Sequence, residues 1–374
     1  MRYCKHTQWL GLAVDDKEVL LQNTDRLQTL LEDLPEPDEQ SPSLIVFIGN
    51  KSKGMAIKEL AKTFTPPPRY GSDCQYQQID RHAWTGNAKL HGRRAQGEIH
   101  LHIHAPSTFS KRPVLLAEGD FPSYDKTRSL TTESCHETSS RLMNVDNVSE
   151  STDRIYFRLL LPFTDVFCFF ADDIGGLKSV VHRLALWLDL GQPSTLPSAT
   201  RPKVLIVLER DEGDDESDST AFRWMLSEET TIDVSEQFSD IQILSITTRN
   251  KALSNKARHR ELFENLLNFS DQVREARIMS QTLFSAHHFA AFFHYALNHA
   301  AKTAVEPFNF IAASRVANPV ATDLCDHLVE FLHDIESPQK TLHFAVPTIA
   351  SSFLLDAYPP DMHCKLSGHI RAIG

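Results

Sequence analysis

The chain has 374 residues, enough for one large domain or for two ordinary domains with sizeable cores. Apolar residues make up 41% of the sequence and charged residues 23%, as in soluble globular proteins. The formal net charge of −11 argues against general nucleic-acid binding and against docking on anionic membranes, because both partners attract a positive surface.

The first predicted element is a helix over residues 15–34, where apolar residues recur at roughly helical spacing. A run rich in proline and charge follows over 35–42 and ends this helix. We therefore expect a leader helix and a linker over residues 1–42. The helix either packs on its own domain or docks on a partner.

Short apolar runs alternate with longer mixed segments in the next part of the chain, as in βαβ units. The runs cover residues 44–48, 98–104, 113–117, 165–171, 203–208 and 241–246. This alternation predicts an α/β domain over 43–250 with a mostly parallel sheet and flanking helices. Residues 96–104 and 111–117 are close enough in sequence to form one antiparallel hairpin at an edge of the sheet.

Polar insertions and a helical region complete the predicted organisation. Residues 123–153 and 209–220 are rich in polar or acidic residues, and we expect flexible insertions there. Beyond Asn250, helix-like segments follow one another without a convincing strand, so an all-helical subdomain is predicted over 251–363.

The most distinctive motif follows the apolar run 44–48. Gly49 and Gly54 have the G-x-x-x-x-G spacing of a phosphate-binding loop, between a strand and a predicted helix as that motif requires. The next two positions are Met55 and Ala56, where a working loop carries a lysine for the phosphates and a hydroxyl for Mg²⁺. The candidate nucleotide-binding residues are Gly49, Asn50, Lys51, Ser52, Lys53 and Gly54.

Two interpretations of this motif stay open. Backbone N–H groups at a helix N-terminus can hold a phosphate without the usual lysine, with charge supplied by Lys51, Lys53 or Lys58. The ligand would then be GTP or ATP with Mg²⁺. The alternative is a tight strand-to-helix turn that binds nothing.

Acidic residues follow two of the predicted strands. Glu118 and Asp120 come directly after the run 113–117, a suitable place for a group that holds Mg²⁺ through water. Asp172 and Asp173 follow the run that ends at Ala171. Ligands of open α/β sheets bind at the carboxyl ends of strands, so these groups are expected to converge on the glycine motif. Ordinary solvated loop starts are the alternative.

Three other patterns give weaker indications of function. Guanine-specific proteins have N-K-x-D after a late strand, whereas this chain has L-E-R-D over 208–211, so guanine recognition of that type is not predicted. His100, His102 and His104 alternate on one predicted strand, where two neighbours could chelate a metal, but a polar face on an edge hairpin is preferred. The aromatic residues around Phe289 and Phe293 are expected mostly in a core, with some at an interface.

The use of cysteine and the pattern of apolar runs predict a cytoplasmic protein. The six cysteines are scattered without a C-x-x-C pair, which favours free thiols in a reducing compartment. No secretory apolar stretch is visible at the N-terminus, and charges and a proline interrupt the longest apolar run, residues 155–171. We therefore expect no transmembrane segment.

The order of strand, glycine motif, helix, hairpin and further strands resembles a GTPase-type P-loop NTPase fold. The sequence is also similar to the N-terminal region of large fungal patatin-like or lysophospholipase-like proteins. The similar stretches are residues 9–16, 43–49, 284–293, 344–347 and 349–356. The resemblance covers residues 1–363 and leaves 364–374 as a divergent tail. The glycine-rich oxyanion loop and G-x-S-x-G motif of the patatin domain do not occur here, so the resemblance implies a regulatory module without lipase chemistry.

The sequence thus predicts a regulatory or binding module with a degenerate P-loop NTPase-like fold, weak or no nucleotide binding and no efficient hydrolysis. One alternative is an active NTPase that uses Lys51 or Lys53 for the phosphates and Glu118 or Asp120 for the metal. Another is a ligand-free scaffold whose helical subdomain binds a protein partner.

Overall fold

The computed structural model of the chain describes residues 6–16, 18–63, 94–121, 127–130, 136–144, 147–210, 215–247, 253–303, 305–316, 322–335 and 337–357. The chain divides into two compact units, Met1–Phe308 and Asn309–Gly374. Each unit is described by itself.

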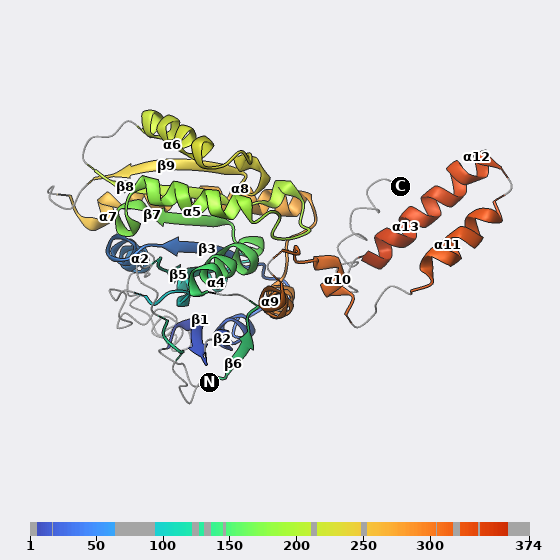
Figure 1. The fold of residues 1–374 in the computed structure, drawn as a ribbon, viewed down its shortest axis with the longest axis horizontal. Coiled ribbons are helices and arrows are strands. Elements are labelled where there is room, and N and C mark those ends of the chain that lie inside the picture. The colour runs from blue at the N-terminus through green and yellow to red at the C-terminus, as the bar shows by residue number, and fades with distance from the viewer. Residues whose placement is uncertain are drawn as a thin grey trace, which may run out of the picture. The chain divides into compact units, whose positions relative to one another are not determined.

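The first unit is built on a sheet whose described strands run in the order β6-β2-β1-β4-β5-β3-β7-β8-β9 (Figure 1). The strands are β1 (Gln8–Asp15), β2 (Glu18–Thr24), β3 (Ser43–Ile48), β4 (Ile99–Ile103), β5 (Val114–Gly119), β6 (Thr138–Leu142), β7 (Val166–Phe170), β8 (Lys203–Glu209) and β9 (Asp240–Ile246).

The pairing directions divide the sheet into two halves. Strands β5, β3, β7, β8 and β9 are parallel to their neighbours within this group. Strands β6, β2, β1 and β4 pair antiparallel, and β4 joins β5 in the same way. The predicted α/β class is confirmed, but the sheet is mixed and not mostly parallel, because the N-terminal segment contributes strands to it.

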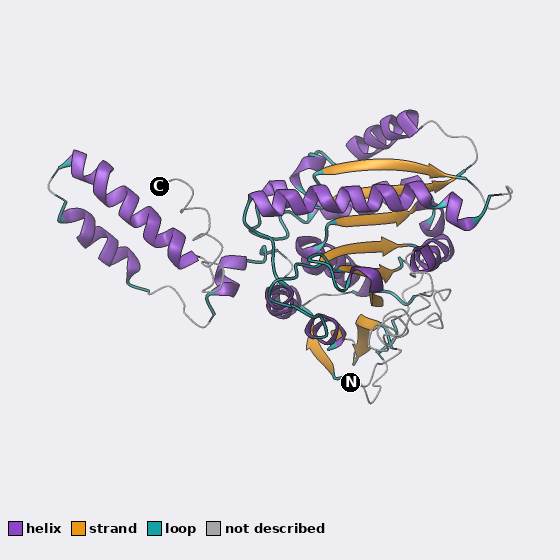
Figure 2. Ribbon diagram, turned by 180° about the vertical axis from the view of Figure 1, so that it is seen from behind, coloured by secondary structure: helices purple, strands orange, loops and turns teal. Residues whose placement is uncertain are grey.

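Helices cover both faces of this sheet. They are α1 (Arg26–Glu32), α2 (Lys51–Thr63), α4 (Val148–Arg154), α5 (Leu177–Asp189), α6 (Asp215–Glu229), α7 (Asn255–Arg258), α8 (Arg260–Met279) and α9 (Ala286–Lys302). Helix α5 crosses the face turned to the viewer in Figure 1, and α8 crosses the opposite face, which Figure 2 shows.

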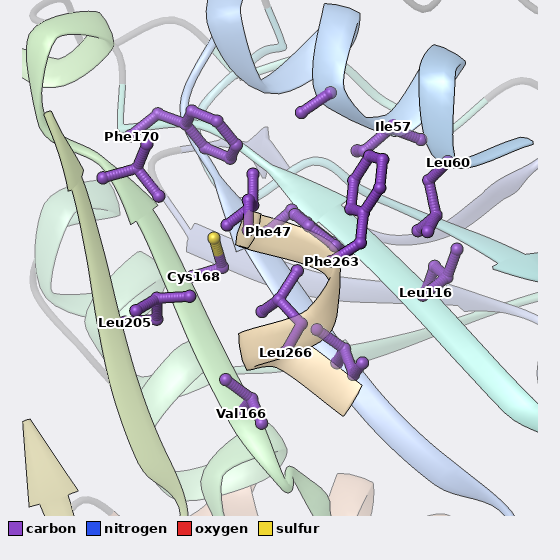
Figure 3. Packing of buried hydrophobic residues seen from close by; sticks show 14 of the residues in the cluster. Phe47, Ile57, Leu60, Leu116, Val166, Cys168, Phe170, Leu205, Phe263 and Leu266 are labelled. Atoms are coloured by element: carbon purple, nitrogen blue, oxygen red, sulfur yellow. The ribbon is translucent and has the colours of Figure 1, made fainter. Parts of the chain in front are cut away.

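Strands β3 and β7 are apolar because they contribute to a core that α2 and α8 cover. All described positions of β3 and β7 are buried, as expected of strands covered on both faces. Phe47 of β3 and Cys168 of β7 belong to a cluster that also contains Ile57 of α2 and Leu262 and Leu266 of α8 (Figure 3). The two leucines are four residues apart, so they lie on one face of α8.

Only the C-terminal part of the helix predicted over 15–34 is formed. Strands Gln8–Asp15 and Glu18–Thr24 pair as the β1–β2 hairpin, and α1 covers only Arg26–Glu32. The alternation of buried residues explains the difference, since Trp9 of β1 and Val19 and Leu21 of β2 are buried in the sheet unit. Tertiary burial of a strand face has outweighed a helix-like spacing.

The predicted hairpin is confirmed as β4 and β5, with His100 opposite Glu118 and His102 opposite Leu116. Its placement at an edge is wrong, because β1 pairs with the other side of β4. The insertion predicted over 123–153 contains β6 and α4, while residues 211–214 of the second insertion lie outside the described residues.

The described region after residue 250 is helical, as predicted, but the domain boundary differs. Helices α8 and α9 belong to the first unit, which ends at Phe308. Phe289 and Phe293 of α9 are buried, with ring centroids 5.2 Å from Phe163 and 4.8 Å from Trp9 respectively, so they do not form an exposed interface.

The second unit contains α10 (Phe310–Ser314), α11 (Leu324–His333), α12 (Pro338–Lys340) and α13 (Val346–Ala357). The predicted tail 364–374 lies outside the described residues. Nowhere in the described chain does a helix combine the length and apolar character that crossing a bilayer requires.

Candidate functional site

The glycine motif is a short turn followed by a helix. Gly49 has a φ of +149°, and its N–H donates to the carbonyl of Gly119 at 3.2 Å. Helix α2 begins at Lys51, so Gly54 already lies in its first turn and donates to the carbonyl of Asn50 at 3.0 Å. The segment therefore does not form an extended loop around an anion position.

The N-terminus of α2 is capped by a carboxylate from a distant part of the chain. Asp173 lies on the 3₁₀ turn Ala171–Ile174, which follows β7. Its Oδ2 accepts from the N–H groups of Asn50 at 2.7 Å and Lys53 at 3.0 Å, and its Oδ1 accepts from that of Ser52 at 3.0 Å. Amides at a helix N-terminus are the groups that bind phosphate in nucleotide sites. Here they bind the protein's own anion.

This arrangement also explains the glycine at position 49. A Cβ there would lie 2.9 Å from Oδ2 of Asp173 and 2.9 Å from Cβ of Phe170, and the φ is one that side chains disfavour. Both the backbone conformation and the close approach of the carboxylate therefore require glycine.

The neighbouring Asp172 binds a third strand end. Its Oδ2 accepts from the N–H of Glu209 at 2.7 Å. Asp172 and Asp173 thus connect the ends of β3, β7 and β8. Acidic residues do meet the glycine turn, as the topology predicts, but they are hydrogen bonded to backbone amides of this chain.

Lys53 is directed into the protein. Its side chain is only 2% exposed, and Nζ donates to the carbonyl of Gly119 at 2.9 Å and lies 3.2 Å from Oε2 of Glu118. Lys51 and Lys58 are exposed on α2. Ala56, at the position of the missing Mg²⁺ ligand, is fully buried in the core cluster.

Glu118 is at the centre of a buried ionic network. Besides Lys53, its carboxylate lies 2.5 Å from Nη2 of Arg94 and 3.4 Å from Nε2 of His102. Burial by itself raises the pKa of Glu118, but the charge of Lys53 and the contacts of His102 and Arg94 outweigh it and hold the pKa well below its usual range. This carboxylate is already compensated by protein groups. Asp120, the other candidate metal ligand, is also buried.

A second polar group adjoins this network. His100 accepts from the hydroxyl of Thr7 at Nδ1, 2.8 Å away, and its Nε2 lies 2.9 Å from Oε1 of Glu98. Burial lowers the pKa of His100, and the N–H of Ala95 donates to Oε2 of Glu98 at 2.8 Å. The face predicted to be a polar edge is therefore a buried hydrogen-bonded layer.

The third alternating histidine is in a different situation. Burial lowers the pKa of His104 to about 4, so its imidazole is neutral near pH 7. Across the described residues, no group of three or more histidine, cysteine, aspartate or glutamate side chains is arranged to hold a metal ion.

Sequence reasoning identified most members of this region but missed Arg94, Glu98 and the role of Asp173. Arg94 and Glu98 lie just before β4 and carry no motif. The sequence places Asp173 near the glycine motif, but no local pattern indicates that it accepts from the amide of Asn50, 123 positions earlier in the chain.

Neither a protein-family model nor a curated protein matches this chain. The chemistry of the site therefore carries the functional interpretation. A capped helix N-terminus, a lysine held in an ion pair and an acidic residue surrounded by cations are arranged to stabilise the fold.

Proposed function

We propose that this chain is a regulatory or binding module with a P-loop NTPase-like architecture, weak or no nucleotide binding and no efficient hydrolysis. The observation that carries the proposal is the carboxylate of Asp173, which accepts hydrogen bonds from the amides of Asn50, Ser52 and Lys53. A phosphate would have to displace this internal anion to reach the same donors.

Two further observations support the proposal. The strand order from β4 to β9, with β4 the antiparallel member, is the one expected of a GTPase-type fold. The groups needed for phosphate chemistry are occupied or absent. Lys53 is paired with Glu118, and position 56 holds a buried alanine in place of a hydroxyl residue. The cytoplasmic location belongs to the same proposal, and the buried free thiol of Cys168 supports it.

Calorimetric titration with GTP, ATP and their diphosphates, with and without Mg²⁺, tests the proposal. The wild-type chain is expected to give no heat at micromolar concentrations. Asp173→Ala should lose about 1–2 kcal/mol of unfolding free energy, because three amides lose their acceptor. Inorganic pyrophosphate should restore part of this loss in the variant and stabilise the wild type much less.

Asp172→Ala is the matched control, because it removes a neighbouring carboxylate and leaves the cap of α2 in place. Pyrophosphate should not discriminate between this variant and the wild type. Micromolar binding of GTP or ATP to the wild type, or phosphate release that Lys53→Met abolishes in a folded variant, would instead establish the active NTPase alternative.

A further inference from the structure

Helices α11 and α13 of the second unit form an antiparallel pair with a very small core (Figure 2). No residue of α11 is buried, and Ala345, in the π-helical turn Thr341–Ala345, is the buried one among the described side chains that follow. Helix pairs of this size usually need a disulfide, a metal ion or association with another chain. Cys325 is a free thiol, and no metal-binding cluster exists among the described residues. Association is therefore expected.

The apolar side chains of α11 show which side of the pair is open. Phe331 and Leu332 lie on either side of the half-buried row through Leu324 and Leu328, because they follow Leu328 by three and four residues. The ring centroid of Phe331 lies 6.2 Å from that of Phe344. Leu332 therefore lies on the opposite side of the helix pair, and Val329, three residues earlier, lies on that side as well.

The chain around α13 repeats this arrangement. Phe344 and Val346 flank the buried Ala345 on either side, since neighbours on a helix are turned by about 100°. Because Phe344 contacts Phe331, Val346 lies on the side of Leu332, and helical spacing adds Leu342 and Phe353. We call the following five residues the apolar face: Val329, Leu332, Leu342, Val346 and Phe353. They are between 42% and 67% exposed.

The border of the apolar face on α11 is complementary to itself. Asp326 and His333 lie three residues before and four residues after Val329, and both are exposed. If α11 packs antiparallel on α11 of a second copy, Asp326 of each copy lies opposite His333 of the other. A carboxylate accepts a hydrogen bond from an imidazole N–H, so the two borders match.

Other acidic residues of this segment lie away from the apolar face. Asp323, Glu330 and Asp334 follow one another at helical spacing on the far side of α11. There, Nε2 of His327 is 3.3 Å from Oδ2 of Asp323, and its Nδ1 is 3.9 Å from Oε2 of Glu330. Their negative charge therefore does not oppose pairing of two apolar faces.

The apolar face is large enough for a dimer of moderate affinity. Covering its five side chains removes roughly 80 Å² of apolar surface for each of them. Two such faces with their polar borders therefore bury on the order of 1,000 Å² in total, the lower limit for a specific interface.

We propose that the apolar face binds the same face of a second copy of this chain, with the two α11 helices antiparallel about a two-fold axis beside Val329. The two helix pairs then form a four-helix bundle, whose core is the paired apolar faces. Interfaces of this kind, in which one surface pairs with itself, are the commonest in homo-oligomers. The inference goes beyond the proposed function and does not depend on it.

Sedimentation velocity of the full chain tests the proposal. The wild type is expected to pass from monomer to dimer with a Kd of roughly 1–100 μM. Val329→Asp and Val346→Asp each place a charge in the apolar face and should raise the Kd at least about tenfold. Both positions are exposed in one copy, so circular dichroism should show unchanged helix content. Val305→Asp is the matched control, because Val305 is 80% exposed and lies outside these helices.

A charge exchange tests the antiparallel arrangement. His333→Asp places carboxylates opposite each other and should raise the Kd at least about fivefold. Adding Asp326→His to this variant restores opposite partners and should return the Kd to within about twofold of the wild type. Both changes oppose the dipole of α11, so an effect on helix stability alone would make the double variant weaker than the single one.

The proposal is overturned if the wild type stays monomeric up to about 200 μM, well above the expected Kd. Equal dimerisation of wild type and of folded Val329→Asp and Val346→Asp would also overturn it. Equal weakening in His333→Asp and in the double variant would overturn the two-fold arrangement. A monomeric wild type in which Val329→Asp lowers the free energy of unfolding would assign the face to a contact within one chain. Each outcome is independent of nucleotide binding, which the titration above measures.

Discussion

Lys53 and Glu118 form an ion pair with 3.2 Å between Nζ and Oε2, and their side chains are 2% and 1% exposed. Removing Lys53 takes away the cation nearest Oε2 and leaves the buried carboxylate of Glu118 with only Arg94 and His102, which is destabilising. Lys53→Met should therefore lower the free energy of unfolding by about 3–5 kcal/mol in urea denaturation. Lys51→Met, at an exposed position two residues earlier, should change it by less than about 0.5 kcal/mol. Similar values for both variants would show that the pair does not stabilise the fold.

The acid sensitivity of the chain should depend on Glu98. Burial raises the pKa of this carboxyl, but hydrogen bonds from His100 and from the amide of Ala95 outweigh it, and the pKa falls from 4.5 to about 2. A lowered native pKa adds stability above the unfolded value of 4.5, and this stability is lost as the pH falls from 4.5 towards 2. The contribution is on the order of 3 kcal/mol.

Urea denaturation at a series of pH values tests this dependence. The difference in unfolding free energy between wild type and Glu98→Gln should shrink from pH 5 to about pH 2.5, as expected from the linkage of protonation to folding. Glu228→Gln, at an exposed position of α6, should follow the wild-type profile. A constant difference between wild type and Glu98→Gln across this range would contradict the assignment.

Gly119 and Tyr156 should show strong coupling. A Cβ at Gly119 would lie 1.9 Å from Oη of Tyr156, so Gly119→Ala should cost about 3 kcal/mol of stability. The buried hydroxyl of Tyr156 makes no hydrogen bond to any described residue, and Tyr156→Phe alone should be close to neutral. In the double variant, about 1–2 kcal/mol of the loss should be recovered, as a double-mutant cycle would measure. Additive effects would mean that the backbone, not the ring, limits this position.

The domain boundary can be tested by truncation. A chain that ends after Phe308 should keep the unfolding free energy of its sheet unit, because that unit contains α8 and α9. A chain that ends at Asn250, the boundary predicted from sequence, should not fold, because it lacks Leu262, Leu266 and Phe289 of the core. Circular dichroism and urea titration distinguish the two truncated chains. Cooperative unfolding of the shorter chain would contradict the observed boundary.

The sequence predicts the parallel half of the sheet better than the antiparallel half. Strands β3, β7 and β8 are nearly continuous apolar runs, and such runs are typical of strands buried on both faces, so the sequence located them correctly. The β1–β2 hairpin was missed because burial of its residues depends on partners elsewhere in the sheet. Local spacing cannot report such partners.

The candidate site shows the same division. The need for glycine at position 49 follows from a strand-to-helix turn and is visible in sequence. Several acidic strand ends are expected near that turn, and no local pattern indicates that Asp173 is the one whose carboxylate binds its amides. Likewise, His100 and His102 alternate on a predicted strand, but that pattern does not show that they contact Glu98 and Glu118 in a buried layer beside Arg94.

Because Asp173 caps α2, the conformation of this turn is not expected to depend on a bound nucleotide. A tethered carboxylate has a high effective concentration at its site, and unlike a nucleotide it is neither hydrolysed nor exchanged. A turn held in this way is not expected to switch between two states as a phosphate binds and is lost. If the chain is the binding module that we propose, its output should depend on the amount of the protein and on its partner, and not on the state of a bound nucleotide.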